Sequence, residues 1–427
     1  MTRRLLTPLF ALFPAALLAQ QPPMHLTLAD AQRLSVQNNP QYSSAKYTAA
    51  AAHQQPAEYR AAELPNLTGV ITGVGADNGS RLAAGALNNP ALYSRAAAGV
   101  LASQLITDFG RIHNLVGTSN LRAQAQDQAS ENTRADVLLG ATRAYFDLLR
   151  AQAVLKVAQQ TVAARQVVVD QITALAQSQL RTQLDVSFAN VNLSDAKLLQ
   201  LQAENGVDSA NAELATALGL PNQTRFDVTD EPMPAALPAQ AGPLITQAML
   251  NRPDLKSLQL QQSAAERFTR AEHDLYYPTV SAIAAAGGVP AGEPQVPGAY
   301  GAVGINVSIP VFNGGLFKAR ESEAALHAKA AAQDVVDLTN RITRDVRVAW
   351  LNATTALQRV SLTQEFVAQA QLALNLAQSR FDLGLGSIVE LSQAQLNLTS
   401  AQIDSATARY DYQAQRAVVD YQVGVLR

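Results

Sequence analysis

Histidines and acidic residues are the side chains in this chain whose chemistry could bind a metal or transfer a proton. The 427 residues include five histidines and no cysteine. No histidine lies four residues from another or beside a glutamate-rich motif, so their spacing does not match a zinc site. The glycines of GVITGVGADNG are not followed by the helix that a phosphate-binding loop requires, and no nucleophile–base pair stands out. We therefore expect no enzyme activity, no cofactor and no metal, and we place all five histidines on helix surfaces: His25, His53, His113, His273 and His327.

The charge of the chain excludes one broad class of partner. The formal net charge is -2, which implies no general attraction to nucleic acid. The sequence has no basic run with interleaved aromatic residues, so we expect no nucleic-acid partner.

The first residues, MTRRLLTPLFALFPAALLAQQ, have the pattern of a secretory signal peptide. Two arginines form a basic start, and the apolar run Leu5–Ala19 follows. A membrane anchor is the alternative, but two prolines interrupt the run, which is also shorter than the roughly 20 residues of a spanning helix. We expect residues 1–20 to be a signal peptide and the mature chain to be exported without a transmembrane helix.

The two halves of the chain repeat one another. NNPQY at residues 38–42 matches NRPDL at 251–255, and ELPNL at 63–67 matches YYPTV at 276–280. Further on, the offset shrinks slightly and then stays constant, which indicates a duplicated unit with a longer loop in the first half. The matched positions beyond that loop are Gly110 with Gly315, Ala144–Tyr145 with Ala349–Trp350, Gln166 with Gln371, Asn192–Leu193 with Asn397–Leu398, and Gly219 with Gly424.

Long helical segments dominate both halves. No proline occurs from Arg111 to about Ser178, or from Leu316 to about Asp382. Apolar residues recur there at a spacing of three and four, and many of them are alanines that allow close helix packing. Each segment would extend roughly 100 Å as a helix, a length suited to a rod or a tube. The apolar stripe of the first half comprises Val137, Ala141, Ala144, Leu148, Ala151, Leu155, Ala158, Val162, Val169, Ile172 and Ala176.

Two pairs of strands with almost no charge precede the long helices. We predict strands at Leu67–Gly75, Ser94–Thr107, Thr279–Ala286 and Ala299–Ile309, with loops at 76–93 and 287–298. About 9–11 residues is the length of a tilted strand that crosses a bilayer. Two hairpins alone cannot cover their edges, so they require copies from other chains.

Taken together, these features resemble the outer membrane efflux protein family, the TolC-like outer-membrane factors. The most specific segments are NRPDL, YYPTV, SIPVFNGGLFKAR and SRFDLGLGSIVELSQAQLNL. The resemblance implies a mainly α fold with a membrane β part, in which four strands per chain contribute to a trimeric 12-stranded barrel and coiled-coil helices form a periplasmic α-barrel. It implies an outer-membrane exit duct of a tripartite efflux pump or type I secretion system. The implied partners are two further copies, a periplasmic adaptor protein, an inner-membrane transporter and outer-membrane lipids.

The resemblance also divides the chain into segments. They are a signal peptide (1–20), short helices (26–63), a β-hairpin (64–109), a long helical hairpin (110–219), a linker (220–243), a short helix (244–276), a second β-hairpin (277–313) and a second long helical hairpin (314–427).

Three groups of site residues are implied by this resemblance. The joints where strand becomes helix are Asp108, Phe109, Gly110, Asn313, Gly314 and Gly315. The turns that would contact an adaptor are Gln179, Leu180, Arg181 and Thr182 in the first half and Gly384, Leu385, Gly386 and Ser387 in the second. The periplasmic aperture would involve Asp185, Glu390, Arg181, Gln393 and Phe381.

Several of these positions depart from the family pattern. Gln179 replaces the usual glycine, and Gln393 and Gly386 replace an acid and an arginine of the best-known member. Arg181 could supply the missing cation, or it could pair with Asp185 at the i+4 position.

An elongated periplasmic coiled-coil structural protein or an adaptor is the alternative function. An adaptor would have one helical hairpin flanked by β-rich halves, whereas this sequence has two hairpins. A structural coiled coil would have no use for two uncharged β-hairpins.

Overall fold

The computed structural model describes residues 24–77, 93–221, 225–292, 294 and 297–426. The predicted signal peptide and most of the predicted 76–93 loop lie outside these residues. The helices are α1 Leu28–Asn38, α2 Pro40–Ala52, α3 Gln55–Ala61, α4 Arg111–Gln177, α5 Gln183–Ala217, α6 Gly242–Asn251, α7 Pro253–His273, the 3-10 helix η1 Asp274–Tyr276, α8 Leu316–Asp382 and α9 Ile388–Val423. The strands are β1 Met24–Leu26, β2 Asn66–Val74, β3 Arg95–Thr107, β4 Phe226–Val228, β5 Thr279–Gly292 and β6 Ala299–Ser308.

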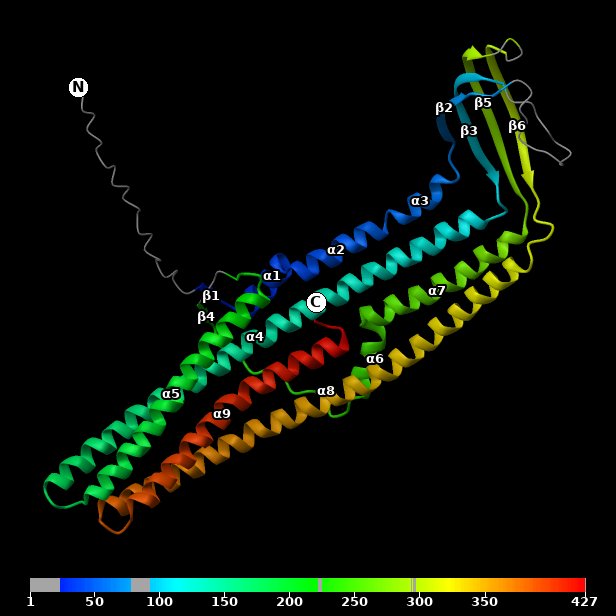
Figure 1. Cartoon of the computed structure of the whole chain (residues 1–427). Coiled ribbons are helices and arrows are strands. Elements are labelled where there is room, and N and C mark those ends of the chain that lie inside the picture. The colour runs from blue at the N-terminus through cyan, green and yellow to red at the C-terminus, as the bar shows by residue number, and fades with distance from the viewer. Residues whose placement is uncertain (1–23, 78–92, 222–224, 293, 295–296, 427) are drawn as a thin grey trace, which may run out of the picture. The chain divides into compact units, whose positions relative to one another are not determined.

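Four of these strands form one antiparallel sheet in the order β2-β3-β5-β6 (Figure 1). The central pair joins the two repeats, with Val100 opposite Ala286. β5 continues to Gly292, so the prediction that residues 287–292 belong to a loop was wrong. The sheet exposes apolar side chains, such as Ile71 at 90% and Val303 at 89%. Within the described part of the chain, the outer strands β2 and β6 each pair on one side only, so a single copy leaves the edges of this sheet uncovered.

The chain divides into two compact units. Unit 1 comprises Met1–Asn38, Gly140–Pro234 and Leu357–Ala414, and unit 2 comprises Asn39–Leu139, Ala235–Ala356 and Gln415–Arg427. The helices α4 and α8 are each 67 residues long and contribute residues to both units. Among the described residues, no helix has the length and apolarity needed to span a membrane.

The core of unit 1 gathers around Tyr145, whose ring is fully buried with Leu148 and Leu214. The Tyr145 hydroxyl donates to the carbonyl oxygens of Leu26 (3.2 Å) and Thr229 (2.6 Å). Leu26 is the last residue of β1 and Thr229 directly follows β4, and these two short strands pair in parallel. The strand β4 lies in the segment 220–243, which the sequence indicated only as a linker, so this pairing was not predicted.

Unit 2 has its own core, in which Leu255 packs against Ile342, Val346 and Val423. The single short helix predicted at 244–276 is two helices, α6 and α7. They separate at Arg252, whose backbone is extended (φ -61°, ψ 123°), as the residue before a proline prefers.

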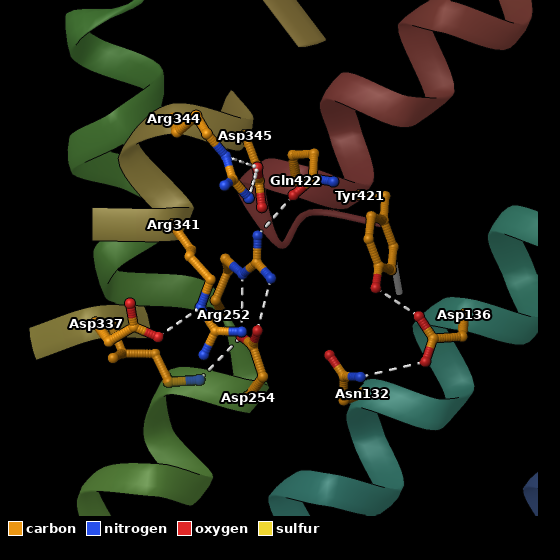
Figure 2. Close-up of polar contacts among 11 residues, drawn as sticks. Asn132, Asp136, Arg252, Asp254, Asp337, Arg341, Arg344, Asp345, Tyr421 and Gln422 are labelled. Carbon is orange, nitrogen blue, oxygen red and sulfur yellow. Dashed lines mark hydrogen bonds and ion pairs between the residues drawn. The ribbon is translucent and has the colours of Figure 1, made fainter. Parts of the chain in front are cut away.

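The side chain of Arg252 connects the bend between α6 and α7 to the end of α9 by hydrogen bonds (Figure 2). It is 9% exposed and donates to both carboxylate oxygens of Asp254 (3.0 and 2.6 Å) and to Gln422 Oε1 (2.6 Å). Burial disfavours the charged form, but Asp254 outweighs that effect and raises the pKa of Arg252. Nearby, the Tyr421 hydroxyl donates to Asp136 on α4.

Candidate functional site

The two turns between the long helices have the same backbone conformation. Gln179 has a φ of 59° and Gly384 a φ of 73°, both in the left-handed region. The amide of the next residue donates back into the preceding helix, from Leu180 to Leu175 O (2.9 Å) and from Leu385 to Arg380 O (2.8 Å). Both helices therefore end in a Schellman-type cap, although only the second turn has glycine at this position.

The side chain of Asp185 takes part in the cap at the N-terminus of α5. Its Oδ2 accepts hydrogen bonds from the Thr182 amide (3.0 Å) and hydroxyl (2.8 Å), and its own amide donates to Thr182 Oγ1 (3.2 Å). This reciprocal arrangement is a capping box, which stabilises a helix N-terminus. An ion pair between Asp185 and Arg181 is not among the contacts of the described residues.

Arg181 instead contacts the second repeat. Its guanidinium carbon lies 4.0 Å from the centroid of the Phe381 ring, and its Nη2 donates to the Phe381 carbonyl oxygen. The Phe381 side chain is 3% exposed and packs in one cluster with Ile172, Val186 and Leu391. A cation over an aromatic face contributes about 0.5–1 kcal/mol at an exposed site and more when desolvated. Arg181 thus links the first turn to the end of α8.

Glu390 pairs with a cation that the sequence analysis did not single out. Arg380 Nε lies 3.1 Å from Glu390 Oε1, and both side chains are about half exposed. The Glu390 amide also donates to Ser387 Oγ at 3.1 Å, so Ser387 caps the start of α9. The only signal for Arg380 in the sequence is a basic residue in the last turn of α8, because the pairing crosses the turn rather than following a helix face.

Gly386 lies where a side chain would come too close to the end of α8. A Cβ at this position would lie 3.2 Å from Arg380 Cβ and from the Phe381 amide nitrogen. Such an approach is tighter than ordinary van der Waals contact, so a side chain here would displace the end of α8. A glycine at this position therefore lets the turn lie close to Phe381, which contacts Arg181, and to Arg380, which pairs with Glu390.

Gln393 lies apart from these contacts and donates to Asn397 along α9 (3.0 Å). One further link between the repeats was missed by the sequence analysis: Asn192 Nδ2 donates to Ser392 Oγ at 2.6 Å. It joins α5 to α9 one residue before Gln393. Short polar side chains on two helices give no sequence signal that they face each other.

The turns themselves expose apolar side chains. Leu180, Leu383 and Leu385 are 71%, 74% and 68% exposed. Exposed leucines at the ends of helical hairpins are candidates for contact with another protein.

The strand–helix joints of unit 2 also repeat. Phe109 and Gly110 have φ of 56° and 111°, and the matching Gly314 and Gly315 have 63° and 84°. Asp108 accepts from the amides of Gly110 (3.1 Å) and Ile112 (2.6 Å), and its counterpart Asn313 accepts from Gly315 (3.2 Å). Two consecutive left-handed residues change the direction of the chain at each joint. Asp108 also caps α4, because Ile112 lies in the first turn of that helix.

Comparisons with known proteins agree with this arrangement. A family model described as outer membrane efflux protein matches residues 32–220 and 244–422. Outer membrane protein TolC of Escherichia coli is 24% identical over 412 residues, covering 91% of this chain and 80% of TolC. Outer membrane efflux protein BepC of Brucella suis is 24% identical over 322 residues, covering 73% of this chain and 68% of BepC.

A solved structure shows the same fold. The crystal structure of the outer membrane protein VceC of Vibrio cholerae matches with a TM-score of 0.78 at 17% identity, covering 93% of this chain and 96% of VceC. The family model matches both repeats, and its matched ranges include the two turns and the two strand–helix joints described above. The chain therefore belongs to the outer membrane efflux protein family.

Proposed function

We propose that this chain is the outer-membrane exit duct of a tripartite efflux pump or a type I secretion system. The observation that carries the proposal is the four-stranded sheet with apolar, exposed side chains, joined at both repeats to helices of 67 residues. The sheet would lie in the outer membrane, and the helices would extend into the periplasm. Family membership supports a channel rather than an enzyme, and it disfavours the adaptor and the structural coiled coil.

Three copies would form the working duct. The edges of β2 and β6 carry backbone groups that have no partner strand in the described part of the chain. An unsatisfied backbone group in lipid costs several kcal/mol, so the strands must close into a barrel. Twelve strands from three chains would remove every edge.

The two turns would form the periplasmic end of the duct. The contacts of Arg181 with Phe381 and of Asn192 with Ser392 support a role in holding the two hairpins of one subunit together. Asp185 and Glu390, repeated around a three-fold axis, would place carboxylates at the aperture. The exposed leucines of the turns would contact a periplasmic adaptor, which in turn would bind an inner-membrane transporter.

The oligomeric state in mild detergent tests this proposal. Protein extracted from outer membranes should give a trimer in native mass spectrometry. A stable monomer recovered from the soluble periplasmic fraction would overturn the duct and favour the structural coiled coil.

A further inference from the structure

A cavity of about 420 Å³ lies in unit 2, beside the point where the strands become helices. Its lining includes Arg60 in the last turn of α3, His113 in the first turn of α4 and Arg267 on α7. In Figure 1, these three helices reach the end of the sheet where the strands begin or end. A water molecule takes up about 30 Å³, so the cavity has room for a larger group.

The cations in this cavity lack acidic partners. Arg267 Nη2 lies 3.0 Å from His113 Nε2, so the polar contact of this arginine is with an imidazole rather than a carboxylate. Arg267 Nε is buried and has no hydrogen-bond partner, and the ion pairs of the described residues include neither Arg60 nor Arg267. Glu63 is the one carboxylate among the described lining residues. A guanidinium that keeps free donors is suited to bind a phosphate.

A glycine in α4, Gly117, leaves room for the side chain of Arg267. A Cβ at position 117 would overlap the Cζ and Nε atoms of that guanidinium. Gly117 lies inside a helix, where glycine costs about 0.5–1 kcal/mol relative to alanine. The glycine is therefore explained by the close approach of the arginine rather than by the helix.

In the second repeat, an acidic residue lies beside the position that corresponds to Arg60. His273 matches Arg60 in the repeat, and its Nδ1 lies 3.0 Å from Glu321 Oε1. The residue that matches Glu321 in the first repeat is Val116, which lines the cavity. The first repeat thus has valine where the second has this acid, so no carboxylate from α4 occupies the corresponding place beside Arg60.

We propose that this cavity binds the phosphate of a membrane phospholipid, at the inner face of the outer membrane. The inference rests on the proposed function, since that places the sheet in the bilayer and the helices in the periplasm. His113 lies within about 5 Å of Gly110 along α4, and Arg267 within about 10 Å of the end of α7. At these distances from the strand–helix joints, the two side chains would lie in or next to the headgroup layer, which is roughly 5–8 Å thick on each side of the hydrocarbon. Exposed aromatic residues at the same end, Tyr276 and Tyr277, fit the interfacial layer.

Lipid retention in native mass spectrometry tests the inference, using the full-length protein in mild detergent with added phosphatidylglycerol. Wild type should retain the lipid. Val116→Glu, which supplies the acid of the second repeat, and Arg267→Gln should each weaken retention about tenfold or more, as expected for loss of a charge-assisted contact. Arg270→Gln is the matched control, because it removes the same charge from the same helix outside the cavity lining. Arg60→Gln replaces Val116→Glu if that variant fails to assemble.

Equal retention by all variants would overturn the inference, and so would equal retention of diacylglycerol, which has no phosphate. Inorganic phosphate that binds as tightly as the lipid would show a site for free phosphate instead. A loss of trimer without a change in lipid retention would show that the cavity receives a carboxylate from a second copy. Ion conductance of the same preparations in planar bilayers tests the duct separately, so a conducting protein without bound lipid refutes only this inference.

Discussion

Gln179 and Gly384 occupy matching places in the two repeats and share a left-handed backbone, with φ of 59° and 73°. A residue with a Cβ in this conformation costs roughly 1 kcal/mol more than glycine. We expect Gln179→Gly to stabilise the protein by about 0.5–1 kcal/mol, because it relieves this strain at the helix end. The thermal midpoint of unfolding, followed by circular dichroism at fixed protein and detergent concentration, would measure the effect. Gly384→Gln is the reverse control and should lower the midpoint. A lower midpoint for Gln179→Gly would show that the glutamine side chain stabilises the turn.

Arg165 lies in the apolar stripe of α4, three residues after Val162 and four before Val169, where the spacing of the stripe would place an apolar residue. It is 4% exposed, and its Nη1 has no hydrogen-bond partner within the described residues. Burial lowers the pKa of this guanidinium, and the charge of Asp195 only partly opposes that effect. The matching residue of the second repeat is Ala370, which is also buried.

We expect Arg165→Met to raise the free energy of unfolding by about 1–3 kcal/mol, since a buried cation without a good partner is costly. Unfolding in urea would measure it. The control is Arg150→Met, which should destabilise the protein, because Arg150 pairs with Asp147 (2.8 Å) and Asp411 (3.3 Å). A destabilised Arg165→Met variant would indicate that Arg165 gains an acidic partner in the assembled protein.

Tyr145 should stabilise unit 1 in a pH-dependent way. Tyr145→Phe removes the donor to Leu26 O and Thr229 O, at a cost of about 1–3 kcal/mol for the groups left unsatisfied. Burial raises the pKa of the phenol above its ordinary value of about 10. The neutral form is therefore favoured by folding, so the contribution is complete below pH of about 10 and is lost as pH rises further.

Urea unfolding of wild type and Tyr145→Phe at pH 7 to 11 would reveal this dependence. The difference between the two proteins should be constant up to about pH 10 and smaller above it. A difference that grows at high pH would contradict the sign argued here. Tyr47→Phe is a suitable control, because the Tyr47 side chain is exposed.

The carboxylates near the turns should make the duct favour cations. A narrow ring of Asp185 and Glu390 side chains around the three-fold axis would focus a negative field. Asp185→Asn keeps an acceptor for the Thr182 cap, and Glu390→Gln keeps the length of the side chain. The double variant should show lower cation selectivity and weaker block by trivalent cations in planar bilayers. Unchanged selectivity and block would place these groups on solvated surfaces.

Sequence reasoning predicted the features that recur locally in both repeats. The sequence has glycine at both strand–helix joints and at the second turn, where the backbone is left-handed: Gly110, Gly315 and Gly384. It could not predict the same backbone at Gln179 or Phe109, because tertiary context outweighs the local preference of those residues. It also missed the pair of Arg380 with Glu390 and the strands β1 and β4. Each depends on residues that only folding brings together.

Single-channel conductance in planar bilayers tests the central claim most directly, namely that this chain forms a conducting duct, and it also tests the prediction that the contact of Arg181 with Phe381 helps to hold that duct closed. The contact is partly exposed, and one such link is worth about 1 kcal/mol, so the double variant Arg181→Leu with Asn192→Ala is the sharper comparison. Both substitutions remove links between the repeats without touching the carboxylates. The account predicts discrete, low conductance for wild type and higher conductance for the double variant. Equal conductance would place the closure elsewhere in the molecule, and no conductance from either protein would contradict the duct itself.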